Sequence, residues 1–231
     1  MVEDAQSALF QRTWGTYRRM VDSNGMFHRE VYGELHRVLV EEVPGPFAFM
    51  DVACGDASST VGALKGTAIA TYVGIDTSQP ALDLAAGNLQ ALGCPAKLIR
   101  RDFVEALADW SGPLKVIWVG MSMHHLQAPG KLDFMRRARG LLGEDGTFAI
   151  WEPTLLPGED RAGWNDRFNA LRPTFWALSD EEFDAFDSHN RAADYQETSE
   201  TWQRLGLEAG FTSAREAFRS PNDLSRMYVF R

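Results

Sequence analysis

Short apolar runs of strand length alternate with helix-length segments through the middle of the chain. This alternation is typical of βαβ units, in which a helix joins two parallel strands of one sheet. Residues 114–119 are almost all apolar, as expected for a strand with helices on both faces. The pattern predicts five parallel strands, at 47–51, 70–75, 97–100, 114–119 and 146–151.

Helices are predicted where the length and the terminal residues agree. Residues 80–92 have Pro80 at their start and Gly93 after their end, as helix termini prefer. Residues 131–142 are also predicted to form a helix. Before the first strand, residues 5–42 predict two aromatic-bearing helices separated by the break DSNG.

The alternation ends after the fifth strand. Residues 153–196 are rich in Pro, Trp, Phe and acidic residues, and Ser179 with Glu182 forms the capping-box pattern of a short helix. A helix at 198–209 and two strands, at 211–218 and 224–230, are predicted to close the chain, the strands being joined by a turn sequence. We therefore expect one α/β domain in four parts: an N-terminal helical cover (1–43), a core sheet (44–152), a cover insertion (153–197) and a last helix with a hairpin (198–231).

Composition excludes several classes of protein. With 45% hydrophobic residues among 231, the chain can build a sizeable core and is not mainly disordered. A net charge of −9 makes it a poor match for duplex nucleic acid or an anionic membrane surface. Cys54 and Cys94 supply neither a disulfide framework nor a four-thiolate metal site. Because the sequence shows no signal-peptide pattern and no apolar run of ~18 residues, we expect a cytoplasmic protein.

Candidate chemistry lies beyond the strand ends, where open α/β sheets bind ligands. The first strand runs into DVACGDAS at 51–58, a tight turn that brings backbone N–H groups close to a ligand. It holds one glycine, Gly55, where a dinucleotide fingerprint has three, and an ordinary βα turn is the alternative. Asp76 follows 21 positions later (76 − 55), near the spacing at which a carboxylate meets ribose hydroxyls. Together these features favour a nucleoside ligand.

The other strand ends carry further candidates. Asp102 beside Phe103 suits an adenine amine and ring, with a helix cap as the alternative for Asp102. The adjacent His124 and His125 supply a general base near pH 7. We expect no metal there, because sequence neighbours rarely ligate one ion together and no carboxylate cluster accompanies them. Glu152 either orients a substrate amine or hydroxyl or caps the next helix.

In this order the motifs resemble the class I S-adenosylmethionine-dependent methyltransferases. The resemblance covers residues 47–152 strongly, and LEAGF at 207–211 with the hairpin resembles the end of the family's domain. It implies a Rossmann-like, three-layer α/β/α fold whose seven-stranded, mostly parallel sheet has an antiparallel last strand and a helical cover. The motifs that carry it are DVACGDA at 51–57, GID at 74–76, RDF at 101–103, MSMHHL at 121–126 and GTFAIWE at 146–152.

The resemblance also implies a cofactor, S-adenosyl-L-methionine, which leaves as S-adenosyl-L-homocysteine, and makes residues 44–152 the cofactor-binding core. Asp76 would take the ribose hydroxyls, Asp102 the adenine amine, and Gly120 with Met121 would lie under the sulfonium. Ala53 and Ala57 depart from the family's usual glycines, so a positive φ is not expected there. The implied cofactor residues are Asp51, Ala53, Cys54, Gly55, Asp76, Thr77, Asp102, Phe103, Gly120 and Met121.

Methyl transfer from a sulfonium is an in-line displacement, so the protein must align the acceptor and remove a proton where the acceptor carries one. His124, His125 and Glu152 are the catalytic candidates. The acceptor site is expected in the segments added to the sheet, whose aromatic residues suit a small-molecule pocket; the core of two cover helices is the alternative. The candidate substrate residues are Trp14, Tyr17, Arg18, Met26, His28, Phe175 and Trp176.

Three functions are compatible with these observations. The leading hypothesis is methyl transfer to a small-molecule metabolite by a monomer or homodimer, without a metal, nucleic-acid or membrane partner. A NAD(P)-dependent oxidoreductase is disfavoured by the missing glycines and by the terminal hairpin, since NAD-type sheets continue parallel. The third hypothesis is a protein that binds the same cofactor for other chemistry.

Overall fold

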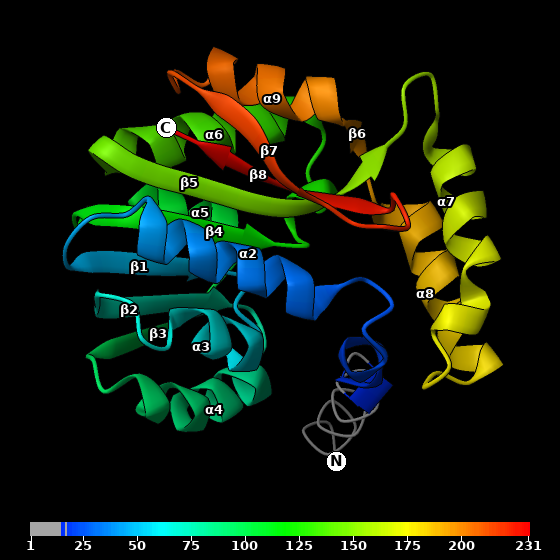
Figure 1. The fold of residues 1–231 in the computed structure, drawn as a ribbon, viewed down its shortest axis with the longest axis horizontal. Coiled ribbons are helices and arrows are strands. Elements are labelled where there is room, and N and C mark those ends of the chain that lie inside the picture. The colour runs from blue at the N-terminus through cyan, green and yellow to red at the C-terminus, as the bar shows by residue number, and fades with distance from the viewer. Residues whose placement is uncertain (1–14, 17) are drawn as a thin grey trace.

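A single twisted sheet lies between two layers of helices (Figure 1). The computed structural model describes residues 15–16 and 18–231. The strand order is β3-β2-β1-β4-β5-β8-β7, and the two-residue strand β6 pairs with the end of β5. The strands are β1 (Phe47–Val52), β2 (Ile69–Asp76), β3 (Ala96–Arg100), β4 (Leu114–Gly120), β5 (Leu142–Leu155), β6 (Glu197–Thr198), β7 (Ala214–Arg219) and β8 (Ser225–Phe230).

Strand direction confirms the predicted fold class. β1 pairs in parallel with β2 on one side and β4 on the other, and β3 and β5 continue the parallel arrangement outward. β8 is antiparallel to both of its neighbours, β5 and β7. From β1 the chain adds β2 and β3 on one side, and it then adds β4 and β5 on the other side of β1. The order of strands therefore reverses between β1 and β4, and ligands of open α/β sheets bind at such a switch point.

The helices cover both faces because the central strands are apolar on both sides. In β4, Val116 and Trp118 contribute to one buried core, and Ile117 and Val119 contribute to the other. No helix in the described part of the chain is both long enough and apolar enough to cross a membrane. The helices are α2 (His28–Glu41), α3 (Ser58–Leu64), α4 (Gln79–Asn88), α5 (Phe103–Asp109), α6 (Ala128–Leu141), α7 (Arg161–Ala170), α8 (Asp180–Ala193) and α9 (Ser199–Glu208).

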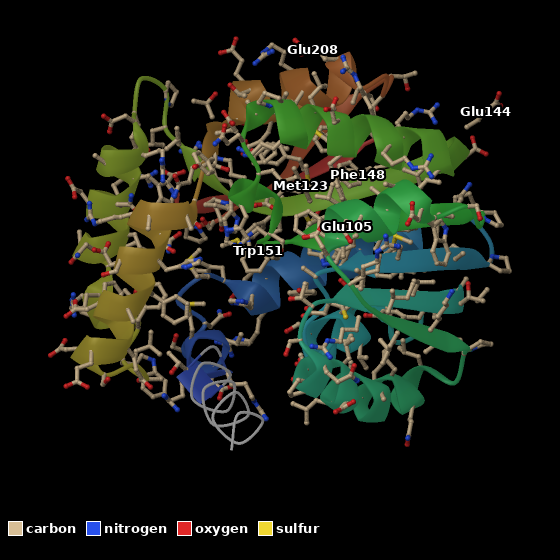
Figure 2. All side chains as sticks on the ribbon, turned by 180° about the vertical axis from the view of Figure 1, so that it is seen from behind. Glu105, Met123, Glu144, Phe148, Trp151 and Glu208 are labelled. Atoms are coloured by element: carbon tan, nitrogen blue, oxygen red, sulfur yellow. The ribbon has the colours of Figure 1, made fainter. Side chains whose placement is uncertain are left out.

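Burial of individual side chains follows this layering. Met123 and Phe148 are buried in the core beneath α5, α6 and α9, whereas Glu105 and Glu208 lie on the outside of α5 and α9 (Figure 2). Trp151, three residues after Phe148, belongs to the opposite core, beneath α2. The two cores therefore divide the alternating positions of one strand.

β5 is longer than the strand predicted at 146–151. It extends to Leu155 because β8 pairs with it at Glu152 and Pro153, and β6 pairs with it at Thr154 and Leu155. These partners come from ~40 to 75 residues further along the chain, so local apolar patterning gives no sign of them.

The insertion after β5 forms two helices, α7 and α8, that pack on each other beyond one end of the sheet (Figure 1). The capping box that opens α8 is present: Ser179 and Glu182 each accept a hydrogen bond from the other's backbone N–H. Phe168 stacks on Trp164 and on Phe183, with ring centroids 5.6 and 4.9 Å apart. These rings extend the buried core beneath α2, which also contains Trp151, into the insertion.

Gly206 in α9 packs closely against Phe230, in the core that lies beneath α5, α6 and α9. A Cβ there would lie 2.3 Å from two ring carbons of Phe230, which is fully buried against Phe148 and Phe211. We expect Gly206→Ala to lower the free energy of unfolding, because overpacking costs ~1–3 kcal/mol and the helix propensity gained is ~1 kcal/mol or less.

The matched control is Gly33→Ala in α2, where a Cβ would meet nothing within 4 Å. We expect this variant to be stabilised by ~0.5–1 kcal/mol. Urea denaturation of both variants measures the difference, and equal stability of the two would contradict the packing described for Phe230.

Candidate active site

A cavity of about 290 Å³ lies at the carboxyl ends of β1, β2 and β4. Seven of the ten implied cofactor residues line it, so the structure brings most of them together. They are Asp51, Ala53, Cys54, Gly55, Asp76, Gly120 and Met121. Further lining residues include Tyr32, Asp56, Thr60, Trp118 and Ser122, most of which sequence reasoning did not single out.

The turn after β1 corrects one expectation. Ala53 and Ala57 adopt positive φ, at 55° and 58°, although alanine was not expected to do so. Gly55 between them has a φ of 54°. A left-handed alanine costs about 1–2 kcal/mol, so the surrounding contacts must hold the turn in shape. One such contact is the backbone N–H of Cys54, which donates to the carbonyl of Ile75 in β2 at 3.0 Å.

Asp76 fastens the same turn to β2. Its Oδ2 accepts from the Gly55 N–H at 2.9 Å, and its Oδ1 accepts from the Ser78 N–H at 2.8 Å. A carboxylate has about four acceptor positions. The half-buried Asp76 therefore keeps acceptor capacity toward the cavity after fixing the turn.

Asp51 is a buried acid at the end of β1. It accepts a hydrogen bond from the Tyr72 hydroxyl at 2.7 Å and is 2% exposed. Burial raises its pKa to about 7, against the opposing effect of the Tyr72 and Thr60 hydroxyls, and Asp76 raises the pKa further. This carboxyl therefore changes charge near neutral pH.

The cavity also offers a ligand one hydrogen-bond donor and the space for a close approach. Trp118 Nε1 is buried and has no hydrogen-bond partner among the described residues. A Cβ on Gly120 would come within 3.3 Å of that nitrogen and of the Tyr32 hydroxyl. The indole N–H and the space beside Gly120 are thus left for a bound group.

Three implied cofactor residues lie outside the lining of this cavity. Asp102 is exposed and its Oδ1 accepts from the N–H groups of Val104 and Glu105, which is the helix-cap alternative. Phe103 packs edge-on against Phe134, at 5.5 Å between ring centroids. Thr77 is exposed and its carbonyl accepts from the Arg100 side chain.

Glu152 organises the loop after β4. Its carboxylate is fully buried and accepts from the backbone N–H groups of Ser122, Met123 and His124 at 2.8 to 3.1 Å. Its Oε2 also lies 2.7 Å from His124 Nδ1. All four acceptor positions are therefore used within the chain, so Glu152 positions the loop and does not reach the ligand cavities.

A second cavity, of about 230 Å³, lies between this loop and the insertion. His124 and His125 line it together with His189 and Asp194, and most of its other walls are apolar: Met20, Met26, Pro153, Trp164, Phe168 and Phe186. Met121 lines both this cavity and the first one. The predicted histidine pair thus stands beside the predicted cofactor site, in a space largely closed by residues far away in sequence.

Asp194 is the principal residue that sequence reasoning missed. It follows α8 and is 3% exposed. The next residue, Tyr195, fixes this segment by donating its backbone N–H to the carbonyl of His124 at 2.7 Å. The Asp194 carboxylate raises the pKa of His125, against partial desolvation of the ring. The reason for expecting no metal, the lack of a carboxylate near the histidines, therefore does not hold in the folded chain.

The predicted substrate residues are dispersed. Met26 lines the second cavity, Arg18 lines the first, and Phe175 is buried in a core. Trp176 is 74% exposed and lines neither cavity. His28 is buried edge-on against Trp151, and burial lowers its pKa to about 4. Trp14 and Tyr17 lie outside the described residues.

Comparisons with known proteins agree with this geometry. Residues 49–146 match the family described as "Methyltransferase domain". The plantazolicin methyltransferase BamL, solved with a desmethylPZN analog and S-adenosylhomocysteine (SAH), is 14% identical, with a TM-score of 0.66 over 94% of this chain and 88% of that chain. Magnesium protoporphyrin IX methyltransferase from Synechocystis PCC 6803, solved with bound SAH, is 15% identical, with a TM-score of 0.64 over 97% and 95% of the two chains.

An O-methyltransferase family protein from Burkholderia thailandensis is 15% identical, with a TM-score of 0.66 over 91% of this chain and 57% of that one. The chain spans between half and two thirds of the length of several other matched structures. No curated protein matches the chain in sequence.

Fold and family match agree: residues 49–146 match a methyltransferase domain, and the chain has the fold of the methyltransferase structures named above. The predicted resemblance to methyltransferases is thereby confirmed, and the predicted cofactor, S-adenosyl-L-methionine, agrees with the SAH bound in two of those structures. The roles of individual residues stay predictions.

The loop held by Glu152 gives a test that needs no ligand. In Glu152→Gln one side-chain oxygen becomes an NH₂ group, so at least the His124 N–H would face a donor. Leaving a buried donor unsatisfied costs ~1–3 kcal/mol, and we expect chemical denaturation to show a loss of that size. The control is Glu105→Gln, which removes an exposed ion pair with Arg101 and should cost under ~1 kcal/mol. A similar small loss in both variants would contradict the role given to Glu152.

Proposed function

We propose that the chain transfers the methyl group of S-adenosyl-L-methionine to a small-molecule acceptor by in-line displacement. The observation that carries this proposal is that two cavities of different character meet at Met121. The first, at the strand ends, is lined by acceptors and backbone turns; the second, beneath the insertion, is mostly apolar with a few polar groups. A donor and an acceptor held in the two spaces would approach each other beside one residue.

In the donor cavity, Asp76 takes the ribose hydroxyls with the acceptor capacity that the turn leaves unused. The turn at 53–57 surrounds the methionine part, and Trp118 Nε1 donates a hydrogen bond to a polar atom of the cofactor. Asp102 uses Oδ1 in capping α5 and keeps Oδ2 for the adenine amine. The cofactor supplies the electrophilic methyl group, so the chain's task is to bind, orient and exclude water.

In the transfer, the bond between methyl and sulfur breaks while a bond between methyl and the acceptor atom forms. A bound cofactor would supply the methyl group as an electrophile and leave as a neutral thioether, and an acceptor that carries a proton would pass it to a histidine ring of the second cavity or to water. His124 and His125 are among the polar groups that face the acceptor. A cavity of about 150 Å³ takes a benzene ring, so the 230 Å³ available suits an acceptor whose enclosed part is little larger than a substituted ring.

Calorimetry with S-adenosylhomocysteine tests the donor site. We expect stoichiometric binding that Asp76→Ala weakens by more than ~1 kcal/mol, because charge-assisted hydrogen bonds are lost. The control is Asp83→Ala, whose carboxylate accepts from Gln79 on the exposed side of α4. Unchanged affinity in Asp76→Ala would refute the ribose assignment. Tight binding of NAD without any response to S-adenosylhomocysteine would refute the donor site as a whole.

Transfer of radiolabelled methyl to a panel of small hydroxyl, amine and thiol acceptors tests the reaction. We expect label in the small-molecule fraction, and His125→Ala should lower turnover more than it lowers cofactor affinity. The control is His36→Ala, because His36 contacts the Ala63 carbonyl between α2 and α3, away from both transfer cavities. Consumption of the cofactor without methyl recovered in any acceptor would instead support other chemistry with the same cofactor.

A further inference from the structure

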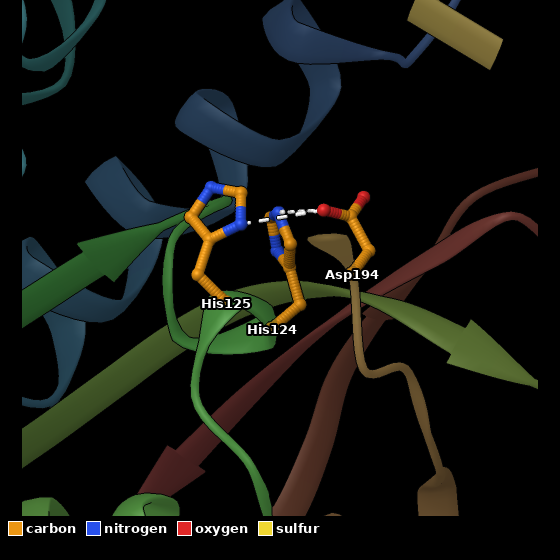
Figure 3. A group of neighbouring side chains, drawn as sticks. All are labelled: His124, His125 and Asp194. Carbon is orange, nitrogen blue, oxygen red and sulfur yellow. Dashed lines mark ion pairs between the residues drawn. The ribbon is translucent and has the colours of Figure 1, made fainter. Parts of the chain in front are cut away.

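Three histidine rings surround one buried carboxylate oxygen. Asp194 Oδ1 lies 3.3 Å from His125 Nδ1, 3.7 Å from His124 Nε2 and 3.8 Å from His189 Nε2. Figure 3 shows the His124 and His125 rings turned toward this carboxylate. None of these contacts has hydrogen-bond geometry, and Oδ1 is buried without a hydrogen-bond partner in the described part of the chain. A buried charge without such a partner is costly, so the cluster is incomplete as it stands.

The tautomer of His124 leaves a second hydrogen-bond acceptor facing Asp194. An ionised Glu152 only accepts hydrogen bonds, so His124 Nδ1, 2.7 Å away, carries the proton that it donates. In the neutral ring, Nε2 then presents its lone pair toward Asp194 Oδ1. Two acceptors thus face each other in a buried space, and a cation between them would satisfy both.

The arrangement around His124 is also one that metal sites use. A histidine that binds a metal through one nitrogen commonly donates its other N–H to a carboxylate, which fixes the tautomer and the ring orientation. Glu152 occupies that place, and it is itself held by the three backbone N–H groups of the loop. His124 is therefore oriented independently of any ion.

We propose that His124 Nε2, His125 Nδ1 and the Asp194 carboxylate bind a divalent transition-metal ion, with zinc as the model case. His189 stands beside these three ligands, with its Nε2 3.8 Å from Asp194 Oδ1. The three ligand atoms lie within 4.8 Å of one another. Tetrahedral zinc ligands lie about 3.3 Å apart, which is the distance between His125 Nδ1 and Asp194 Oδ1. Small movements of the rings toward Oδ1 complete the set. Two histidines and one carboxylate form a recurring ligand set that leaves coordination positions open.

The open side of the site faces the second cavity. His125 and His189 are 41% and 58% exposed in their side chains, whereas Asp194 and His124 are buried behind them. All four residues line the same cavity as Met121, which also borders the donor site. If the proposed function holds, the ion binds an acceptor through oxygen, nitrogen or sulfur near the methyl group. Metal binding itself does not depend on methyl transfer.

Metal binding is measured on the metal-free full chain by calorimetry with zinc and by visible absorption with cobalt. We expect one ion per chain, with a Kd of about 1 µM or tighter, and cobalt bands typical of nitrogen and oxygen ligands without thiolate charge transfer. Asp194→Asn should weaken binding by at least ~10-fold, and His189→Gln should weaken it less. His36→Ala is the control and should bind as tightly as the unaltered chain.

Two results would overturn the proposal: no stoichiometric binding, or the same affinity in Asp194→Asn as in the unaltered chain. Either result would mean that the three histidines interact with Asp194 only as ion pairs or hydrogen bonds, without a metal ion. Calorimetry with S-adenosylhomocysteine on the same metal-free samples separates this outcome from failure of the donor site. Glu152→Gln tests whether Glu152 orients His124. All three proposed ligands are intact in this variant, so weaker cobalt binding would show that the loss acts through the orientation of His124.

Discussion

The carboxylate of Glu152 determines where the loop after β4 can lie, and both cavities depend on that loop. A charge buried in the sheet is tolerated only when its acceptor positions are filled. Three consecutive backbone N–H groups and one imidazole fill them. The same strand holds Met121, whose N–H donates to the Trp151 carbonyl at 2.7 Å and whose φ is 54°. Trp151 of β5 therefore holds Met121, the residue between the two cavities, and the next residue, Glu152, holds the three residues that follow Met121.

The remaining wall of the second cavity is tied to this loop by backbone contacts from a distant segment. Tyr195 donates to the His124 carbonyl, and its own carbonyl accepts from Lys131. Lys131 is fully buried and also pairs with Glu197 at 2.8 Å, at the start of β6. A buried ammonium needs such partners, and in meeting that need it places the chain at 194–197 beside the histidines. The position of Asp194 thus follows from the contacts that Lys131 of α6 makes with Tyr195 and Glu197.

The sequence was informative where structure is decided locally. The apolar strands, the helix termini at Pro80 and Gly93, and the capping box at Ser179 follow from neighbouring residues, and the structure agrees with them. The turn at 53–57 and Asp76 could be located because a strand end and a spacing define them. The positive φ of Ala53 and Ala57 could not, since tertiary contacts override the local preference of alanine.

Residues joined by long-range contacts were harder to assign. Glu152 was recognised as a strand-end acid, but nothing near it in sequence indicates that it would accept from residues ~30 positions earlier. Asp194 lies 69 positions after His125 (194 − 125), in a segment without a motif. The aromatic residues of 153–196 predict a pocket, and three of them, Trp164, Phe168 and Phe186, line the second cavity. Phe183 instead stacks on Phe168 within the core, and Trp176 is exposed.

That aromatic stack has a consequence for how relatives of this chain can diverge. Because α7 and α8 pack on each other beyond one end of the sheet, the pair can change the shape of its inner surface while the central parallel strands keep their own packing. Selection on the molecule that is modified would then act on residues 161–193, and selection on the shared cofactor would act on the strand ends. One domain can in this way come to accept a different molecule while it keeps the same cofactor, by altering about a seventh of its length (33 of 231 residues).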